Sequence, residues 1–312
     1  MPFINGCHHL TLCVGKAQED VDFHVKMLGM RFIKRTVLFD GETPVYHLYY
    51  SNQNGDPGSI VTTFPFHQAG IFGRRGTNQA REVLLSVPTG SLDFWQQRLR
   101  AHGIGAEAFE VLGSRRLRFL HPSGVEYVLV VVDGDAREGH AGFGVPKEYA
   151  VHGVHGIGVH VHTPDLTLEF LGKYLAGKDT MRDGERFAID TGAHNQGGVI
   201  ELTVNRSDDQ GSWIYAGGTI HHFALNAGDL DNQDEIKLAV EGAGYTDISE
   251  LKDRKYFKSV YVRSPGGLLC EIAVTHPEGG WTCDESPKEL GQRFQLPRQF
   301  EALLSHLEKI DI

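Results

Sequence analysis

The stretch 265-PGGLLCEIAV-274 combines a glycine turn with a short apolar strand, and the same combination occurs three more times along the chain. It returns as 122-PSGVEYVLVV-131, as 197-GGVIELTV-204 and, more loosely, as 57-PGSIVTTF-64. A turn followed by a run of β-branched and long apolar residues predicts a strand. Recurrence of the same combination in one order indicates an internal repeat.

A strand-like opening and a helix precede each of these final strands. The openings are 8-HHLTLCV-14, 82-EVLLSV-87, 154-VHGIGVHV-161 and 220-IHHFALN-226. Apolar residues with helical spacing follow at 18–29, 91–103, 166–177 and 233–244, and each stretch ends at or near a glycine. Segments 44–51 and 257–264 add strands inside the units. The sequence therefore predicts an α+β fold built from four βαβββ modules.

A polar, glycine-rich stretch at 133–153 separates two modules on each side and predicts a linker. We expect an N-terminal two-module domain at 1–135, a C-terminal two-module domain at 152–280 and a helical tail at 281–312.

Composition limits the partners and the compartment. The net charge of −10 argues against nucleic-acid and anionic-membrane partners, which select clustered Lys and Arg. The first residues lack the features of a signal peptide, and the longest apolar run, 127–132, is too short to cross a bilayer. Cys7, Cys13, Cys270 and Cys283 form no C-x-x-C motif. A reduced, cytoplasmic protein is expected, and a homo-oligomer is compatible with the sequence.

The openings of the first and last modules each carry a His-His doublet. Because side chains alternate across a strand, His9 and Thr11 should lie opposite the apolar face that the helix covers. The same parity turns His222 towards a cavity, and it leaves His8 and His221 on the apolar face as structural residues. The plainer alternative for either doublet is one core and one surface histidine.

Glu271 lies in an otherwise apolar final strand, where a carboxylate is costly unless it is paired or bound to metal. Its parity places it on the face opposite Cys270. In the other modules its position aligns with Thr62, Val128 and Leu202, and this alignment leaves Glu201 and Glu126 out of register. Gly156 of the third opening replaces the inward histidine, so only the first and last modules keep ligand-type residues.

Two neutral imidazoles and one carboxylate are the ligands of non-haem Fe(II) sites that leave positions open for substrate and O2. We therefore expect His9, His222 and Glu271 to bind a metal ion. The ligand types alone do not separate Fe(II) from Mn(II), and zinc or nickel would also bind such a set. His47, His155, His160 and His162 are set aside as core, strand-start or surface residues.

Several stretches resemble the vicinal-oxygen-chelate superfamily, and more narrowly its hydroquinone ring-cleaving dioxygenases, of the 2,6-dichlorohydroquinone 1,2-dioxygenase type. They are 8-HHLTL-12, 31-RFIKRTVLFDG-41, 44-PVYHLYY-50, 61-VTTFPF-66, 211-GSW-213, 220-IHH-222 and 254-RKYFKSVYVRSPGG-267 with Glu271. The resemblance implies two tandem domains that form open mixed-sheet barrels. It also implies an Fe(II) enzyme that cleaves a small aromatic substrate with O2, although Mn(II) or Zn(II) could occupy the site in a purified sample.

The resemblance implies the same three ligands and adds roles around them for His8, Thr11, His221, Arg254 and Tyr261. Arg254 would stabilise negative charge; its alternative is a surface arginine in 252-KDRK-255. Tyr261 would point into the cavity or remain at its rim. His8 or His221 would act as acid or base.

Three other functions compete with this hypothesis. An O2-independent glyoxalase-type lyase or isomerase would use zinc or nickel and a fourth protein ligand, where this chain has Thr62. A catechol extradiol dioxygenase would, by resemblance, take its first histidine from the third module, where Gly156 stands. A non-enzymatic binding protein on the same scaffold would not need the two histidines and the glutamate together.

Overall fold

The computed structural model confirms the four βαβββ modules. It describes residues 3–38, 45–67, 70–192, 197–214, 216–296, 298–307 and 309–311. Residues 39–41 and Pro44, which belong to two of the stretches that carry the resemblance, lie outside the described residues.

Each module begins with a strand and a helix and continues with three strands. The first contains β1 (Cys7–Val14), α1 (Ala17–Val21), a π-helix η1 (Asp22–Met27), β2 (Arg31–Val37), β3 (Tyr46–Ser51) and β4 (Ile60–Pro65). The second contains β5 (Gln79–Val87), α2 (Leu92–Ala101), β6 (Ala106–Val111), β7 (Ser114–Leu120) and β8 (Glu126–Val131).

The second half of the chain repeats this order. The third module contains β9 (Gly153–Val161), α3 (Asp165–Tyr174), β10 (Lys178–Asp183), β11 (Arg186–Asp190) and β12 (Val199–Val204). The fourth contains β13 (Thr219–Asn226), α4 (Leu230–Gly242), β14 (Lys252–Asp253), β15 (Phe257–Arg263) and β16 (Leu269–Thr275). Short 3-10 helices are η3 (Lys147–Tyr149), η4 (Gly280–Thr282) and η5 (Arg298–His306).

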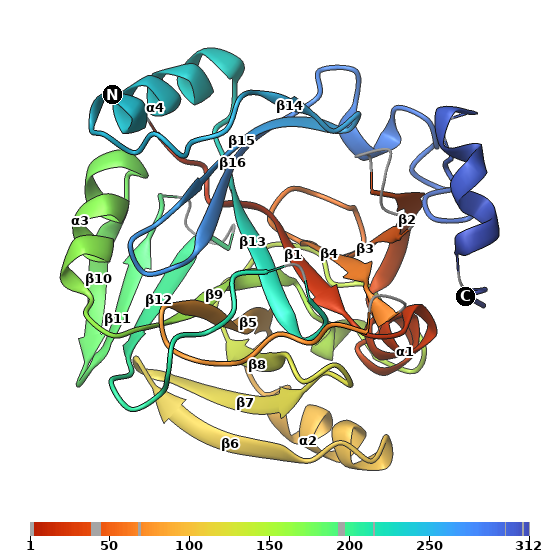
Figure 1. The fold of residues 1–312 in the computed structure, drawn as a ribbon. Helices are drawn as coiled ribbons and strands as arrows, with labels where there is room; N and C mark the ends of the chain where they lie inside the picture. The colour runs from red at the N-terminus through yellow and green to blue at the C-terminus, as the bar shows by residue number, and fades with distance from the viewer. Residues whose placement is uncertain are drawn as a thin grey trace.

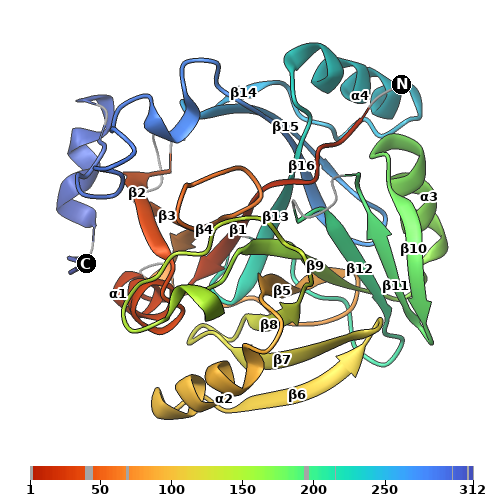
Figure 2. The same cartoon turned by 180° about the vertical axis from the view of Figure 1, so that it is seen from behind.

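The strands form two curled, mixed sheets of eight strands (Figures 1 and 2). One has the order β14-β15-β16-β13-β1-β4-β3-β2, and the other has the order β10-β11-β12-β9-β5-β8-β7-β6. The first sheet thus joins modules one and four, and the second joins modules two and three. Each sheet takes one module from either side of the linker, and the division into domains at 1–135, 152–280 and 281–312 stays a prediction.

One continuous apolar core contains residues from both sheets and from the four α-helices. Alternation along the strands puts Leu10, Leu12 and Val14 of β1 into this core. A smaller apolar cluster lies on the other face of the first sheet and includes Tyr49, Phe257 and Trp281. That face also contains the polar side chains described below. Within the described residues, no helix has the length and the apolar character needed to cross a membrane.

The segment after β16 packs against the edge of the first sheet (Figure 1). The ammonium of Lys34 on β2 is fully buried and donates to Asp284 at 2.6 Å and to Glu285 at 2.5 Å. Trp281 joins the smaller apolar cluster. The tail therefore closes one end of the face that carries the candidate site.

Candidate metal centre

Strands β1 and β13 lie side by side and antiparallel in the middle of the first sheet (Figure 1). In their register His9 pairs with Ala224 and Thr11 pairs with His222. Strand β16 runs parallel to β13 and pairs Glu271 with Ala224. These three strands therefore bring two histidines and one glutamate to one face of the sheet.

The three side chains meet at their nitrogen and oxygen atoms. Nε2 of His9 lies 3.1 Å from Nε2 of His222, which lies 2.8 Å from Oε2 of Glu271. Nε2 of His9 lies 3.7 Å from the same carboxylate oxygen. His9 and Glu271 are fully buried, and His222 is 4% exposed. Such spacing allows all three groups to bind one ion.

Both doublets contain a β-bulge, which the sequence did not predict. His8 falls between the paired residues Cys7 and His9, and His221 falls between Ile220 and His222, so each is the extra residue of its strand in the β1–β13 register. A bulge re-aims the extra side chain. As a result, His8 and His221 do not stay on the apolar face to which strict alternation assigned them.

Each bulge histidine contacts the candidate ligand histidine that follows it in the chain. Nδ1 of His8 lies 2.9 Å from Nδ1 of His9, and Nδ1 of His221 lies 2.5 Å from Nδ1 of His222. An imidazole that donates its Nδ1–H outwards presents an unprotonated Nε2 inwards, and such a second partner fixes the tautomer of a metal ligand. Nε2 of His8 is in turn 3.0 Å from the hydroxyl of Thr275.

The chemistry of the three groups fits a divalent cation. Burial lowers the pKa of His9 well below its ordinary value and lowers the pKa of His222 to about 3, so both rings are neutral at physiological pH. Both carboxylate oxygens of Glu271 are buried, and neither accepts a hydrogen bond from the described residues. Lone pairs that converge in a buried space without donors are costly, and a bound cation removes that cost.

The remaining predicted residues surround this group. The hydroxyl of Thr11 lies 2.8 Å from that of Thr62. Tyr261 pairs with Glu271 across β15 and β16. Arg254 lies over the Tyr261 ring, with its guanidinium carbon 5.7 Å from the ring centroid. Burial and then the Glu271 charge raise the pKa of Tyr261, so its phenol keeps its proton.

A cavity opens beside the ligand atoms. Its lining contains the candidate ligands His9 and His222, the predicted residues His221, Arg254 and Tyr261, and five further residues: Leu38, His47, Tyr49, Phe64 and Phe257. Its volume of about 30 Å³ holds a water molecule or two, so an aromatic ring enters only when lining side chains move aside.

His47, which the sequence pattern left aside, and Tyr49, which it did not single out, both line this cavity. Strand parity could have found them, because 44-PVYHLYY-50 alternates and β3 sends Leu48 and Tyr50 into the opposite, core face.

The second sheet corrects one part of the repeat alignment. Glu201 pairs with Gly158 in the way that Glu271 pairs with Ala224, two residues beyond Gly156 and His222 respectively. The expectation that Glu201 is out of register, with Leu202 equivalent to Glu271, is therefore wrong. The alignment used the turn glycines, but the connection to β12 is one residue shorter, and a slip of one residue reverses strand parity.

Arginines neutralise the carboxylates at the equivalent place in the second sheet. The carboxylate of Glu201 forms ion pairs with the guanidinium nitrogens of Arg116 at 2.8 Å and Arg186 at 3.4 Å. That of Glu82 forms one with Arg186 at 3.2 Å. All four side chains are at least nine-tenths buried. Because these oxygens already have cationic partners, this cluster is an ion-pair network and lacks the character of a metal site.

Asp20, His24 and His121 form a second buried group of ligand-type residues. The backbone N–H of Ser123 donates to Nδ1 of His121 at 3.0 Å, so that ring carries its proton on Nε2. This Nε2 lies 3.2 Å from Oδ1 of Asp20, whose other oxygen accepts from Tyr50. Oδ2 of Asp20 accepts hydrogen bonds from Tyr50 and Thr63. Neither oxygen of Glu271 accepts one from the described residues, so the case for a metal ion is weaker at Asp20.

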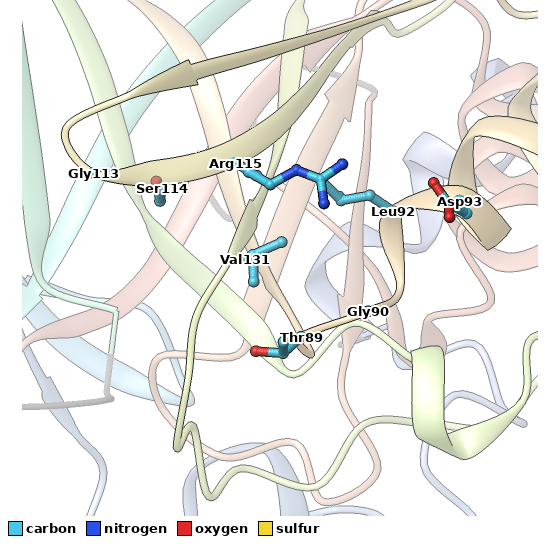
Figure 3. A pocket seen from close by; sticks show the side chains of 8 residues that line it. All are labelled: Thr89, Gly90, Leu92, Asp93, Gly113, Ser114, Arg115 and Val131. Atoms are coloured by element: carbon cyan, nitrogen blue, oxygen red, sulfur yellow. The ribbon is translucent and has the colours of Figure 1, made fainter.

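A larger cavity, of about 280 Å³, lies elsewhere, between α2 and the β6–β7 hairpin (Figure 3). There Arg115 extends from β7 towards Leu92 and Asp93 of α2. Its lining contains one carboxylate and no imidazole, so this cavity does not offer a metal site.

Comparisons with known proteins agree with this geometry. No family model matches the chain. It is 39% identical over 309 residues to the chlorohydroquinone/hydroquinone 1,2-dioxygenase of Sphingobium indicum, which covers 97% of this chain and 95% of that protein. The crystal structure of a candidate dioxygenase from Bacillus subtilis has a TM-score of 0.89 at 30% identity, over 98% of this chain and 96% of that one. Glyoxalase I from Zea mays, with a TM-score of 0.64 at 14% identity over 86% of this chain and 92% of that one, shares the fold alone.

Proposed function

Because this chain belongs to the family of ring-cleaving dioxygenases that includes hydroquinone 1,2-dioxygenases, we propose that it opens a hydroquinone-type aromatic ring with O2 in an Fe(II)-dependent reaction. The resemblance inferred from the sequence, to the vicinal-oxygen-chelate superfamily and its hydroquinone ring-cleaving members, is confirmed by these relatives. A small aromatic substrate and O2 follow from the family. The hydroquinone, the iron and the roles of individual residues are our proposal.

The observation that carries the proposal is the buried His9, His222 and Glu271 group, whose carboxylate accepts no hydrogen bond from the described residues. These three residues would hold the metal. When bound, Fe(II) would bring the aromatic substrate and O2 together and pass charge between them. Thr62 occupies the position equivalent to Glu271 in the first module, so the chain offers no fourth carboxylate there.

The surrounding residues would bind and polarise the reactants. The guanidinium of Arg254 stays charged at any physiological pH and would stabilise negative charge on a ring oxygen. Tyr261 would donate a hydrogen bond from the same wall. His8 and His221 would hold the ligand imidazoles in the tautomer that presents Nε2 to the metal. The hydrogen bond between Thr11 and Thr62 would fix the direction of the Thr11 hydroxyl.

The cysteines support the proposed cytoplasmic location. Cys7, Cys13, Cys270 and Cys283 are all free thiols, and Cys283 is exposed. An exposed free thiol suits a reducing compartment.

O2 uptake on an oxygen electrode tests the proposal. The apo-protein is loaded anaerobically with Fe(II) and offered hydroquinone, methyl- and chlorohydroquinones, and catechol. We expect uptake with a hydroquinone, which is lost in His9→Ala and kept in the surface variant His162→Ala. Stoichiometric metal binding without uptake on any of these compounds would instead indicate an O2-independent lyase.

A further inference from the structure

The first sheet carries an approximate two-fold relation between modules one and four. Thr62 pairs with Thr11 and Glu271 pairs with Ala224, each two residues beyond a ligand histidine. On the next strand outwards, Tyr49 pairs with Thr62 and Tyr261 pairs with Glu271. Tyr49 is therefore the counterpart of Tyr261, and both tyrosines line the cavity beside the ligands.

A hydrogen-bonded chain supports Tyr49. Its hydroxyl lies 2.8 Å from Nδ1 of His47, whose Nε2 lies 2.9 Å from the hydroxyl of Thr62. Thr62 in turn contacts Thr11 at 2.8 Å. Tyr49 is 1% exposed and His47 is 8% exposed, so water does not compete for these contacts. In module four the equivalent partner is Ser259, whose hydroxyl donates to that of Tyr261 at 3.2 Å.

The donor and acceptor roles in these hydrogen bonds decide whether the Tyr49 hydroxyl can donate into the cavity. A neutral imidazole donates from one nitrogen and accepts at the other. When Nε2 of His47 accepts from Thr62, its Nδ1–H donates to the Tyr49 oxygen, and the phenol O–H is left to donate into the cavity. Burial and then the Glu271 charge raise the pKa of Tyr49 well above its ordinary value, so this donor is present at any physiological pH.

A substrate with two ring oxygens needs such a donor. One oxygen would face His9, His222 and Glu271, and the other would enter a buried pocket with apolar walls such as Phe64 and Phe257. An oxygen buried there without a partner costs free energy. We propose that Tyr49 is a substrate-binding residue that donates a hydrogen bond to the substrate oxygen remote from the ligand group, and that His47 positions its hydroxyl. This inference rests on the proposed function and deepens it.

The test separates the two substrate oxygens. Anaerobic calorimetry of the Fe(II)-loaded protein measures the Kd of hydroquinone and of phenol, which lacks the second hydroxyl. We expect Tyr49→Phe to weaken hydroquinone binding about three- to ten-fold and to change phenol binding less than about two-fold. Equal effects on both ligands, or none on hydroquinone, would overturn the assignment. Tyr256→Phe is the matched control, because its buried hydroxyl donates to Asp284 at 3.0 Å outside the cavity lining.

Two substitutions of His47 test its positioning role. Asn at this position places an amide where Nδ1 stands, and Gln places one where Nε2 stands. We expect His47→Asn to keep the preference for hydroquinone over phenol and His47→Gln to lose it. Loss in both variants, or retention in both, would overturn the positioning role. If the wild-type protein bound no hydroquinone, the proposed function would fall together with this inference; if it bound and cleaved hydroquinone, only the Tyr49 assignment would be at stake.

Discussion

At the residue scale, one histidine of each doublet lies in the candidate metal site, and the other lies against its ring. Strand alternation was enough to predict that His9, His222 and Glu271 share a face. It could not predict which way His8 and His221 point. A β-bulge depends on how two strands pair, and neither strand's own sequence pattern reveals it. The resemblance supplied those two residues, and the bulges supply the physical reason.

Removing either bulge histidine should weaken metal binding. We expect His8→Leu and His221→Leu each to lower the affinity for Fe(II) or Mn(II) about 10- to 100-fold, because the ligand imidazole loses the partner of its Nδ1. Competition with a chromophoric chelator measures the change. His162→Leu, on the surface, is the control and should bind metal normally. Unchanged affinity in both site variants would contradict the proposed role.

At the element scale, the first helix differs from its prediction. The apolar spacing at 18–29 predicted a regular helix, but α1 ends at Val21 and a π-helix continues to Met27. Asp20, a fully buried carboxylate, lies near the end of α1, just before the π-helix. Wider helical turns occur at sites with special side-chain contacts, and the partners of Asp20 lie on elements that no local pattern reveals.

Asp20 connects the helix to two modules. Its Oδ2 accepts from Tyr50 of β3 at 2.6 Å and from Thr63 of β4 at 2.5 Å, and its Oδ1 faces His121 of the second module. Although burial alone would raise its pKa, the neighbouring His24 and the contact with His121 lower the pKa of Asp20 below its usual range. The carboxylate is therefore ionised in the folded protein.

Neutralising this carboxylate should destabilise the whole chain. We expect Asp20→Asn to lower the free energy of unfolding by about 3–5 kcal/mol, since buried donors lose a charged acceptor. Asp22→Asn, at the start of the adjoining π-helix, is the matched control; its carboxylate is half exposed, so the loss should stay below about 1 kcal/mol. Urea unfolding measures both. A loss in Asp20→Asn no larger than in the control would show that the network contributes little.

At the scale of the whole molecule, the sequence predicted the four modules and the order of their elements, because turns and periodicities are local. It predicted that modules one and four lie together only because both carry ligand-type residues. No local sequence pattern predicts that β1 pairs with β13. The slip at Glu201 has the same origin: the length of a turn, which apolar spacing does not record, sets the register.

Buried neutral histidines make the stability depend on pH. Burial lowers the pKa of His8 to about 4 and the pKa values of His155 and His222 to about 3. The unfolded chain binds protons at these groups below about pH 6.5, while the folded chain does not, so stability is complete above that pH and falls as the pH is lowered. Ionised carboxylates such as Asp20 act in a separate window, below about pH 4.

We therefore expect these three groups to cost the chelator-treated protein on the order of 6 kcal/mol of unfolding free energy between pH 7 and pH 5, about 2 kcal/mol for each. Urea unfolding at each pH, with a chelator present to remove any metal contribution, measures this loss. Constant stability across that interval would show that these imidazoles titrate in the folded state as they do in the unfolded chain.

The pairing of β1 with β13 also delays completion of the first sheet while the chain is being synthesised. His9 and His222 are 213 residues apart, and a ribosome adds about 5–20 residues each second. The first module thus waits roughly 10–40 s for the strand that completes its sheet. Until then one edge of β1 stays open to strands of neighbouring chains. Rapid expression of this protein should therefore depend on factors that shield the nascent chain.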